Sequence, residues 1–277
     1  AAYCKRRWDM ALEPQPPAAR EFLSLLPYML QTGLPGDAGK SKNPLHLDIA
    51  GYHPGFACWE IMQKQYETLD LAEPGKNALP VAGLYALGQL GTLAQPGGAE
   101  FELLLLLDVK EIDDQTLKAL KHRLERVQAF ARKQHGVNVR FTVVTSASIR
   151  YGQFSLPEWE KFSPGEAALQ KEQLSRTLLP LYGKTPAWWL TPPGVSAEEH
   201  HDHLEQLAEL PYFFGERTVD LGFPLKVMPQ EFFGACLFEL ANVFDNPFVC
   251  LMRYGMLVRF LKSGSASEVL VFDKIKQ

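Results

Sequence analysis

Two glutamates spaced two residues apart, Glu100 and Glu102, are the side chains best placed for chemistry in this sequence. They begin an apolar segment typical of a β-strand, and residues i and i+2 of a strand point to the same face, so the two carboxylates share a face. The segment follows a glycine-rich stretch that includes Gly88 and Gln89, and glycines allow a loop to approach phosphates closely. Such a carboxylate pair suits two divalent cations that bridge a nucleoside triphosphate. Two glutamates on the exposed face of an edge strand have the same spacing, so both interpretations stay open.

Two other polar patterns are similar to known sites but are incomplete. Residues 33–41 resemble a phosphate-binding P-loop, although five residues separate the two glycines where the motif has four. The dense polar run 198–203 places His200 and His203 three residues apart on a predicted helix, but no further ligand lies at a known offset. The simpler interpretations are a plain loop at 33–41 and a solvated first helical turn at 198–203.

Alternating strands and helices in the middle of the chain must position the glutamates. Hydrophobic periodicity predicts strands at 81–87, 100–108 and 137–145, and a long helix over 111–136 that ends at Gly136. Further helices are predicted at 18–31, 56–69, 165–182, 197–210, 230–244 and 246–263. We expect a loop without regular elements at 32–55, a strand at 187–191, and burial of 246–263, which is apolar nearly all round.

Composition excludes several classes of protein. The chain has 277 residues, of which 46% are hydrophobic and 22% charged, and this is a globular composition. A net charge of −4 gives no reason to expect a nucleic-acid partner. No apolar run approaches the about 20 residues of a membrane span, and residues 1–10 lack the apolar region of a secretory signal. Four cysteines without a Cys-x-x-Cys pair predict reduced thiols and a cytoplasmic location.

A series of short stretches resembles a known family. The stretches are 22–27, 83–88, 136–141, 176–177, 183–184, 198–200, 220–222, 231–235 and 244–247. In this order and spacing they are similar to the N-terminal catalytic region of the class I adenylate cyclases of gamma-proteobacteria, over about residues 20–260. The resemblance implies a nucleotidyltransferase-like fold and a site that converts ATP to cAMP and pyrophosphate.

Three catalytic-motif positions differ from that family. The resemblance implies serine at Gln89 and aspartate at Glu100 and Glu102. The additional methylene of glutamate moves each carboxylate outward by roughly an ångström. Because Mg²⁺ demands near-ideal octahedral geometry at about 2.0–2.1 Å, two such extensions disturb a metal site.

The helical region near the end of the chain also differs. Lysines that the family carries there correspond to Asn242 and Val249, which leaves Arg253 as the remaining cation for a triphosphate. A site that lacks the serine hydroxyl at position 89 and these lysine amino groups loses electrostatic stabilisation of phosphoryl transfer. Retention of the scaffold with loss of catalytic groups is typical of a pseudoenzyme.

We therefore expect an α+β chain with a small mixed sheet and flanking helices. Its expected parts are an N-terminal helical and loop segment (1–76), a nucleotidyltransferase-like core (77–150) and a mainly helical C-terminal subdomain (151–277). The leading hypothesis is a degenerate adenylate-cyclase-like domain, catalytically inactive or impaired, that needs no cofactor and acts as a binding or regulatory module for a protein partner.

Two alternatives remain open. One is an active adenylate cyclase in which Glu100 and Glu102 hold Mg²⁺, and the other is a structural interaction domain that binds no nucleotide. In the leading hypothesis, ATP or another nucleotide binds weakly through Gly88, Gln89 and Arg253.

Overall fold

The structure is a computed structural model, and it describes residues 2–34, 45–65, 78–87, 90, 100–152, 170–171, 174–175, 177–210, 217–223, 229–241, 243–244 and 247–263. The chain divides into two units. The first comprises Ala1–Ser146, Thr177–Thr185 and Tyr212–Val219, and the second comprises Ala147–Arg176, Pro186–Pro211 and Asp220–Gln277.

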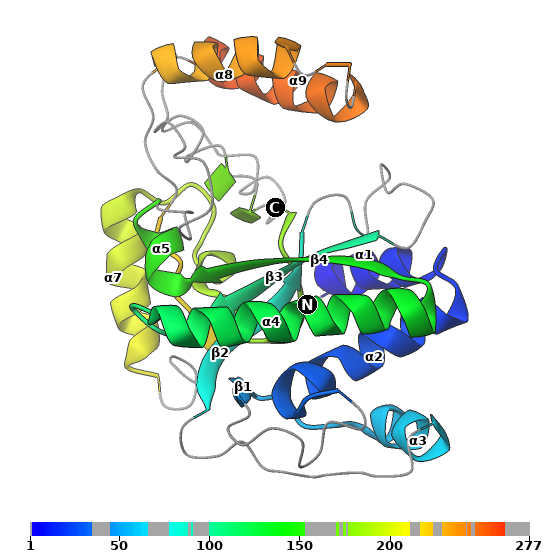
Figure 1. The fold of residues 1–277 in the computed structure, drawn as a ribbon. Helices are drawn as coiled ribbons and strands as arrows, with labels where there is room; N and C mark the ends of the chain where they lie inside the picture. Colours follow the sequence, from blue (N-terminus) through cyan, green and yellow to red (C-terminus); the bar gives the residue numbers. More distant parts are fainter. Residues whose placement is uncertain are drawn as a thin grey trace. The chain divides into compact units, whose positions relative to one another are not determined.

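A mixed sheet lies at the centre of the first unit (Figure 1). Its middle strands are β2 (Leu79–Ala86) and β3 (Glu100–Leu107), which pair antiparallel. On one side, β4 (Asn138–Thr145) pairs parallel with β3. On the other side, both β1 (Leu47–Ile49, parallel) and β5 (Leu179–Gly183, antiparallel) pair with β2. The mixed sheet with flanking helices confirms the predicted α+β class.

Burial along β3 explains why its sequence forms an inner strand. Phe101 and all residues of 103–107 are buried, whereas Glu100 and Glu102 are exposed. A strand paired on both sides and covered on both faces needs such a continuous apolar run, and alternation appears only at its beginning.

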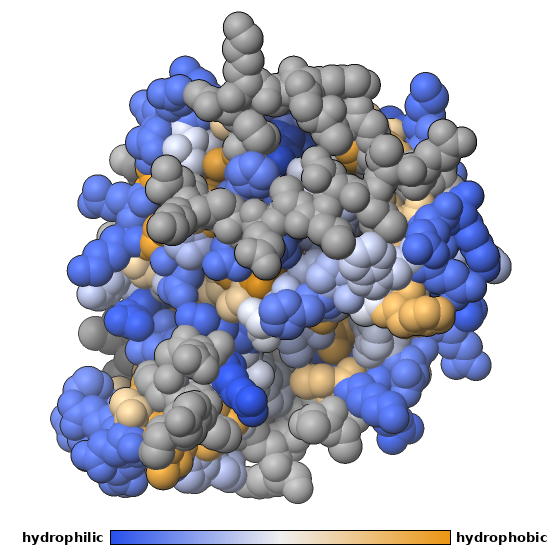
Figure 2. Space-filling model, turned by 90° about the horizontal axis from the view of Figure 1, so that it is seen from below, coloured by the Kyte–Doolittle hydropathy of each residue, from blue (hydrophilic) through white to orange (hydrophobic). Residues whose placement is uncertain are grey.

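Figure 2 shows one face of the molecule, on which hydrophilic residues dominate the described surface and hydrophobic residues form smaller patches.

The long helix α4 (Asp114–Phe130) has clear signals at both ends. The Asp113 side chain caps its N-terminus by accepting a hydrogen bond of 2.9 Å from the Thr116 backbone amide. A π-helical turn (Ala131–His135) continues it, and Gly136 ends it in the left-handed conformation at φ +66°. Its buried face consists of Leu117, Leu120, Leu124 and Val127.

Helix α2 (Pro17–Thr32) contacts both α4 and β1. Arg123 of α4 donates from Nη1 to the Leu30 carbonyl oxygen at 2.6 Å, near the C-terminus of α2, where helical carbonyls lack partners within the helix. Helix α1 (Ala2–Leu12) contacts β5, and α3 (Phe56–Gln65) contacts α2.

The described elements of the second unit are mainly helical. They are α5 (Ser146–Arg150, whose first residue belongs to the first unit), a 3₁₀ turn (Ala187–Trp189), α7 (Ala197–Ala208), α8 (Pro229–Ala241) and α9 (Pro247–Ser263). Helices α8 and α9 pack on each other. A two-stranded sheet pairs β6 (Thr185–Pro186) with β7 (Thr218–Val219), and of its residues only Pro186 belongs to the second unit. Among the described residues, none of the helices has the length and apolar character needed to span a bilayer.

Most predicted elements are confirmed within two or three residues of their expected ends, but two predictions in the first unit are wrong. The segment 32–55 contains the short strand β1, which pairs with β2. The predicted helix 165–182 is wrong only in its last part: the described residues 170–171, 174–175 and 177 are helical, but the chain forms β5 from Leu179. Pro180 disfavours a helix interior and is tolerated in an edge strand such as β5, so it was the available signal.

Two further predictions, in the second unit, are also wrong. The segment 187–191 forms a 3₁₀ turn rather than a strand. Helix α9 buries Cys250 and Leu257, but it exposes Phe248, Leu251 and Met252, so it is not covered all round. Residues 66–69 of the predicted helix 56–69 lie outside the described residues.

The pairing of β5 with β2 can be tested at Gly183, which has φ +105° and whose added Cβ would overlap the Ala82 carbonyl oxygen and the Gly83 Cα. Gly183→Ala should lower the free energy of unfolding by about 3 kcal/mol or more in urea denaturation, because backbone strain and overlap add. The control is Gly136→Ala, at φ +66° with nothing within 4 Å of an added Cβ, and it should cost about 1–2 kcal/mol. Equal losses in the two variants would contradict this pairing.

Candidate functional site

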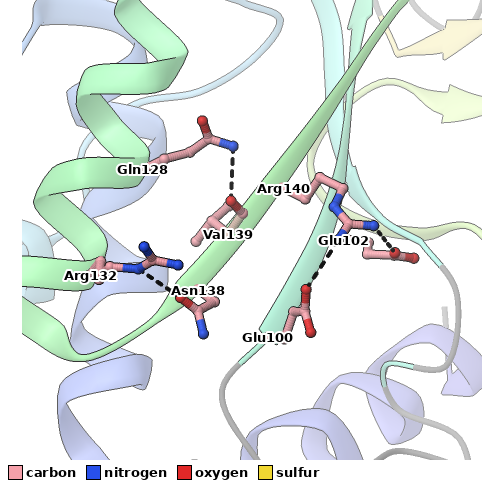
Figure 3. A network of polar contacts seen from close by, with 7 residues as sticks. All are labelled: Glu100, Glu102, Gln128, Arg132, Asn138, Val139 and Arg140. Atoms are coloured by element: carbon pink, nitrogen blue, oxygen red, sulfur yellow. Dashed lines mark hydrogen bonds and ion pairs between the residues drawn. The ribbon is translucent and has the colours of Figure 1, made fainter. Parts of the chain in front are cut away.

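Glu100 and Glu102 lie at the start of β3, on the exposed face of the strand (Figure 3). Their side chains are 59% and 48% exposed, whereas Phe101 between them is buried. The alternation that the sequence predicts is therefore present at this end of the strand, and both carboxylates are within reach of the same neighbouring strand.

Arg140 of β4 contacts both carboxylates. The parallel register places Glu102 opposite Arg140 and Glu100 opposite Asn138. The Arg140 guanidinium lies 3.5 Å from Glu100 Oε1 through Nη2, and 3.4 Å from Glu102 Oε1 through Nη1. Figure 3 shows this guanidinium bridging the pair. Analysis of the sequence missed Arg140 as a member of the candidate site, since it lies 38 residues from Glu102 along the chain.

Two hydrogen bonds from the helical layer hold the beginning of β4 (Figure 3). Gln128 of α4 donates from Nε2 to the Val139 carbonyl oxygen at 2.9 Å. Arg132, in the π-helical turn, donates from Nε to Asn138 Oδ1 at 3.1 Å. Both contacts lie within two residues of Arg140, so its backbone is fixed although its side chain is 68% exposed.

These residues do not fit a pair of magnesium ions. A divalent cation between the two carboxylates needs both of them, because they supply its oxygen ligands and balance its charge. The Arg140 guanidinium already contacts both carboxylates. Within the described part of the chain, no group of three or more His, Cys, Asp or Glu side chains is placed to hold a metal ion. A cation at Glu100 and Glu102 would therefore have to displace Arg140 or tolerate its positive charge nearby.

The predicted nucleotide-binding residues are not placed by the structure. Gly88 and Gln89 lie outside the described residues, as does Asn242. Arg253 and Val249 belong to helix α9, but their side chains are not among those described. The structure therefore brings together only the two glutamates of the predicted site. Of the segment 33–41, only residues 33 and 34 are described.

The histidine-rich run at the start of α7 has a structural role. Ser196 accepts from the Glu199 amide at 3.2 Å, and the Glu199 carboxylate accepts from the Ser196 amide at 2.7 Å, which is a capping box. These contacts lower the pKa of Glu199. His200 is buried, with its ring 5.2 Å from that of Phe223, whereas His203 is half-buried.

A second polar cluster, in the second unit, joins Arg150 and Lys171 to the stretch 220–222. Lys171 is fully buried and donates from Nζ to the Arg150 carbonyl oxygen at 3.0 Å. Arg150 Nη2 lies 3.1 Å from Asp220 Oδ2, and the Gly222 amide donates to Asp220 Oδ1 at 2.7 Å. Burial lowers the pKa of Lys171 to about 8, and the charge of Asp220 opposes this shift. A single lysine in an amphipathic segment gives no sequence signal for such burial.

The fold and the carboxylate pair define an α+β domain with acidic side chains at the start of a central strand. The chain belongs to the family described as the adenylate cyclase NT domain, whose model matches residues 1–189. This confirms the resemblance found in the sequence.

Individual relatives agree with this assignment. The adenylate cyclases of Shigella flexneri and Escherichia coli strain K12 are each 23% identical to the chain over 274 residues, covering 98% of this chain and 32% of the relative. The adenylate cyclase of Yersinia pestis is 23% identical over 278 residues, with the same coverage. The chain thus spans about a third of the length of these relatives. No solved structure matches it.

The buried lysine generates a prediction about pH. The folded-state pKa of Lys171 lies near 8, below its ordinary value of 10.5, so the folded state binds fewer protons between these values and stability rises with pH across them. Lys171→Met should raise the free energy of unfolding at pH 7 by on the order of 2 kcal/mol, and this advantage should shrink between pH 8 and pH 10. Urea denaturation of both proteins at several pH values measures the difference.

The matched control for this pH experiment is Lys118→Met, at an exposed position of α4. It should give no advantage that changes with pH. A difference between wild type and Lys171→Met that stays constant from pH 7 to pH 10 would refute the lowered pKa.

Proposed function

We propose that this chain is a degenerate adenylate-cyclase-like domain with impaired catalysis that acts as a binding or regulatory module. The observation that carries the proposal is the contact of Arg140 with both Glu100 and Glu102. Two-metal phosphoryl transfer needs carboxylates that hold cations against a triphosphate. A carboxylate pair already engaged by a guanidinium is poorly suited to that task.

The lengths of the acidic side chains support the same conclusion. Glutamates replace the aspartates that the resemblance implies, so the carboxylates lie farther from the strand than the family chemistry requires. A misplacement of about 1 Å in a catalytic constellation can cost on the order of a hundredfold in rate. The nucleotidyltransferase-like core at 77–150 and the division into three segments belong to this proposal.

An active adenylate cyclase is the second candidate function. It is favoured by the family, by the relatives, which are adenylate cyclases, and by the preserved negative charge at Glu100 and Glu102, which are both accessible on one face. In this case the two glutamates would hold Mg²⁺, and the metal would supply charge stabilisation at the transferred phosphate.

An assay for cAMP separates the two functions. With ATP and either Mg²⁺ or Mn²⁺, the purified chain should form no more cAMP than its Glu100→Gln/Glu102→Gln variant, because the acidic pair does not support catalysis. Product is quantified by chromatography. Turnover by the wild type that Glu102→Gln abolishes would establish the active cyclase instead.

Calorimetry with ATP tests the binding role. We expect weak binding with a dissociation constant in the millimolar range, reduced further in the variant Arg253→Gln because a cation is lost near the triphosphate. Lys118→Gln removes an equal charge at an exposed position of helix α4 that is not part of the proposed site, and it should leave the affinity unchanged. Absence of heat with millimolar ATP would favour a structural domain that binds no nucleotide.

A further inference from the structure

We propose that Arg140 is the resident counter-ion of Glu100 and Glu102 and that it competes with divalent cations for this pair. The proposal rests on the proposed function and deepens it, since it names the side chain that weakens metal binding at the site. It concerns equilibrium metal affinity, which can be measured without any catalytic turnover.

The geometry supports a specific bridging role. Arg140 uses separate nitrogens for the two glutamates, Nη2 at 3.5 Å from Glu100 and Nη1 at 3.4 Å from Glu102. A guanidinium is planar and carries donors on both branches, so one arginine can span two carboxylates that a compact ammonium would meet one at a time. The register of the sheet places it directly opposite Glu102, on the same exposed face.

The surrounding contacts make this position a fixed feature of the fold. Gln128 holds the Val139 carbonyl and Arg132 holds the Asn138 side chain, so the two residues before Arg140 are attached to the helical layer. Arg132 itself is engaged by Asn138. Two exposed arginines therefore lie in or next to β4, and of these two it is Arg140 that contacts the carboxylates.

Charge arithmetic sets the size of the effect. A guanidinium beside the two carboxylates reduces their combined charge from −2 to −1, and its charge repels a cation about 4 Å away even in a watery environment. Because Arg140 is mostly exposed, its side chain can rotate away at little cost and relieve part of the repulsion. We therefore expect its removal to tighten divalent binding by about tenfold.

The experiment is a Mn²⁺ titration at pH 7, in which electron paramagnetic resonance reports free Mn²⁺. Arg140→Gln should bind one Mn²⁺ at the Glu100/Glu102 pair with a dissociation constant about tenfold lower than that of the wild type. The double variant Arg140→Gln/Glu102→Gln should lose this gain in affinity. The matched control Lys133→Gln removes an equal charge at an exposed position of the π-helical turn that precedes β4, and it should retain the wild-type affinity. Arg140→Lys keeps the positive charge but lacks the two-branched guanidinium, and it should have an intermediate Mn²⁺ affinity.

Equal Mn²⁺ affinities of wild type and Arg140→Gln would overturn the proposal, as would a gain of the same size in Lys133→Gln. The variants are expected to fold, because exposed ion pairs contribute only about 0–1 kcal/mol, and circular dichroism checks this. Should Arg140→Gln not fold, Arg140→Lys decides the question through its own shift in affinity. The outcome is separate from the cAMP assay: unchanged Mn²⁺ affinity without turnover defeats only this proposal, whereas wild-type turnover defeats the proposed function.

Discussion

The parallel pairing of β3 with β4 determines which side chains meet at the candidate site. Because side chains alternate along a strand, a shift of one residue would turn Arg140 to the buried face and bring Val139 to the exposed one. The register observed instead buries Phe101 and Val139 together and leaves Glu102 and Arg140 exposed together. Burial of apolar side chains in the core thus selects the register, and the register places a guanidinium on two carboxylates.

The helical layer fixes the same register from outside the sheet. The apolar face of α4 packs inward, and Gly136 reverses the chain in the left-handed conformation immediately before β4. Gln128 and Arg132 then attach the beginning of β4 to the helix that precedes it. The apolar face of α4 and the contact of Gln128 with the Val139 backbone do not involve Arg140 or the glutamates, whose contact is exposed. The family's fold can therefore persist while the charge of its site changes.

Local patterns in the sequence were sufficient for the main elements. The apolar run after Glu102 and the spacing of Leu117, Leu120 and Leu124 each predict their element without knowledge of any partner. Elements that depend on distant pairing were missed. The three residues of β1 are too few to show periodicity, and β5 exists because β2 offers an edge, which no local pattern reveals.

The candidate site was predictable to the same extent. The two glutamates share a strand, so their common face follows from spacing alone. Arg140 lies in a different strand, and its meeting with Glu100 depends on a register set by the whole core. The burial of Lys171 likewise depends on Arg150 and Asp220, which are close only in the fold.

The most direct test of this account is a crystal structure of the wild-type chain with Mn²⁺ and a non-hydrolysable ATP analogue. The Mn²⁺ concentration should be near the dissociation constant of the Arg140→Gln variant, and an anomalous difference map locates the metal. The account predicts Arg140 within ion-pair distance of Glu100 and Glu102, with no manganese peak between them. Two ordered manganese ions bound by both carboxylates, with Arg140 turned away, would contradict it.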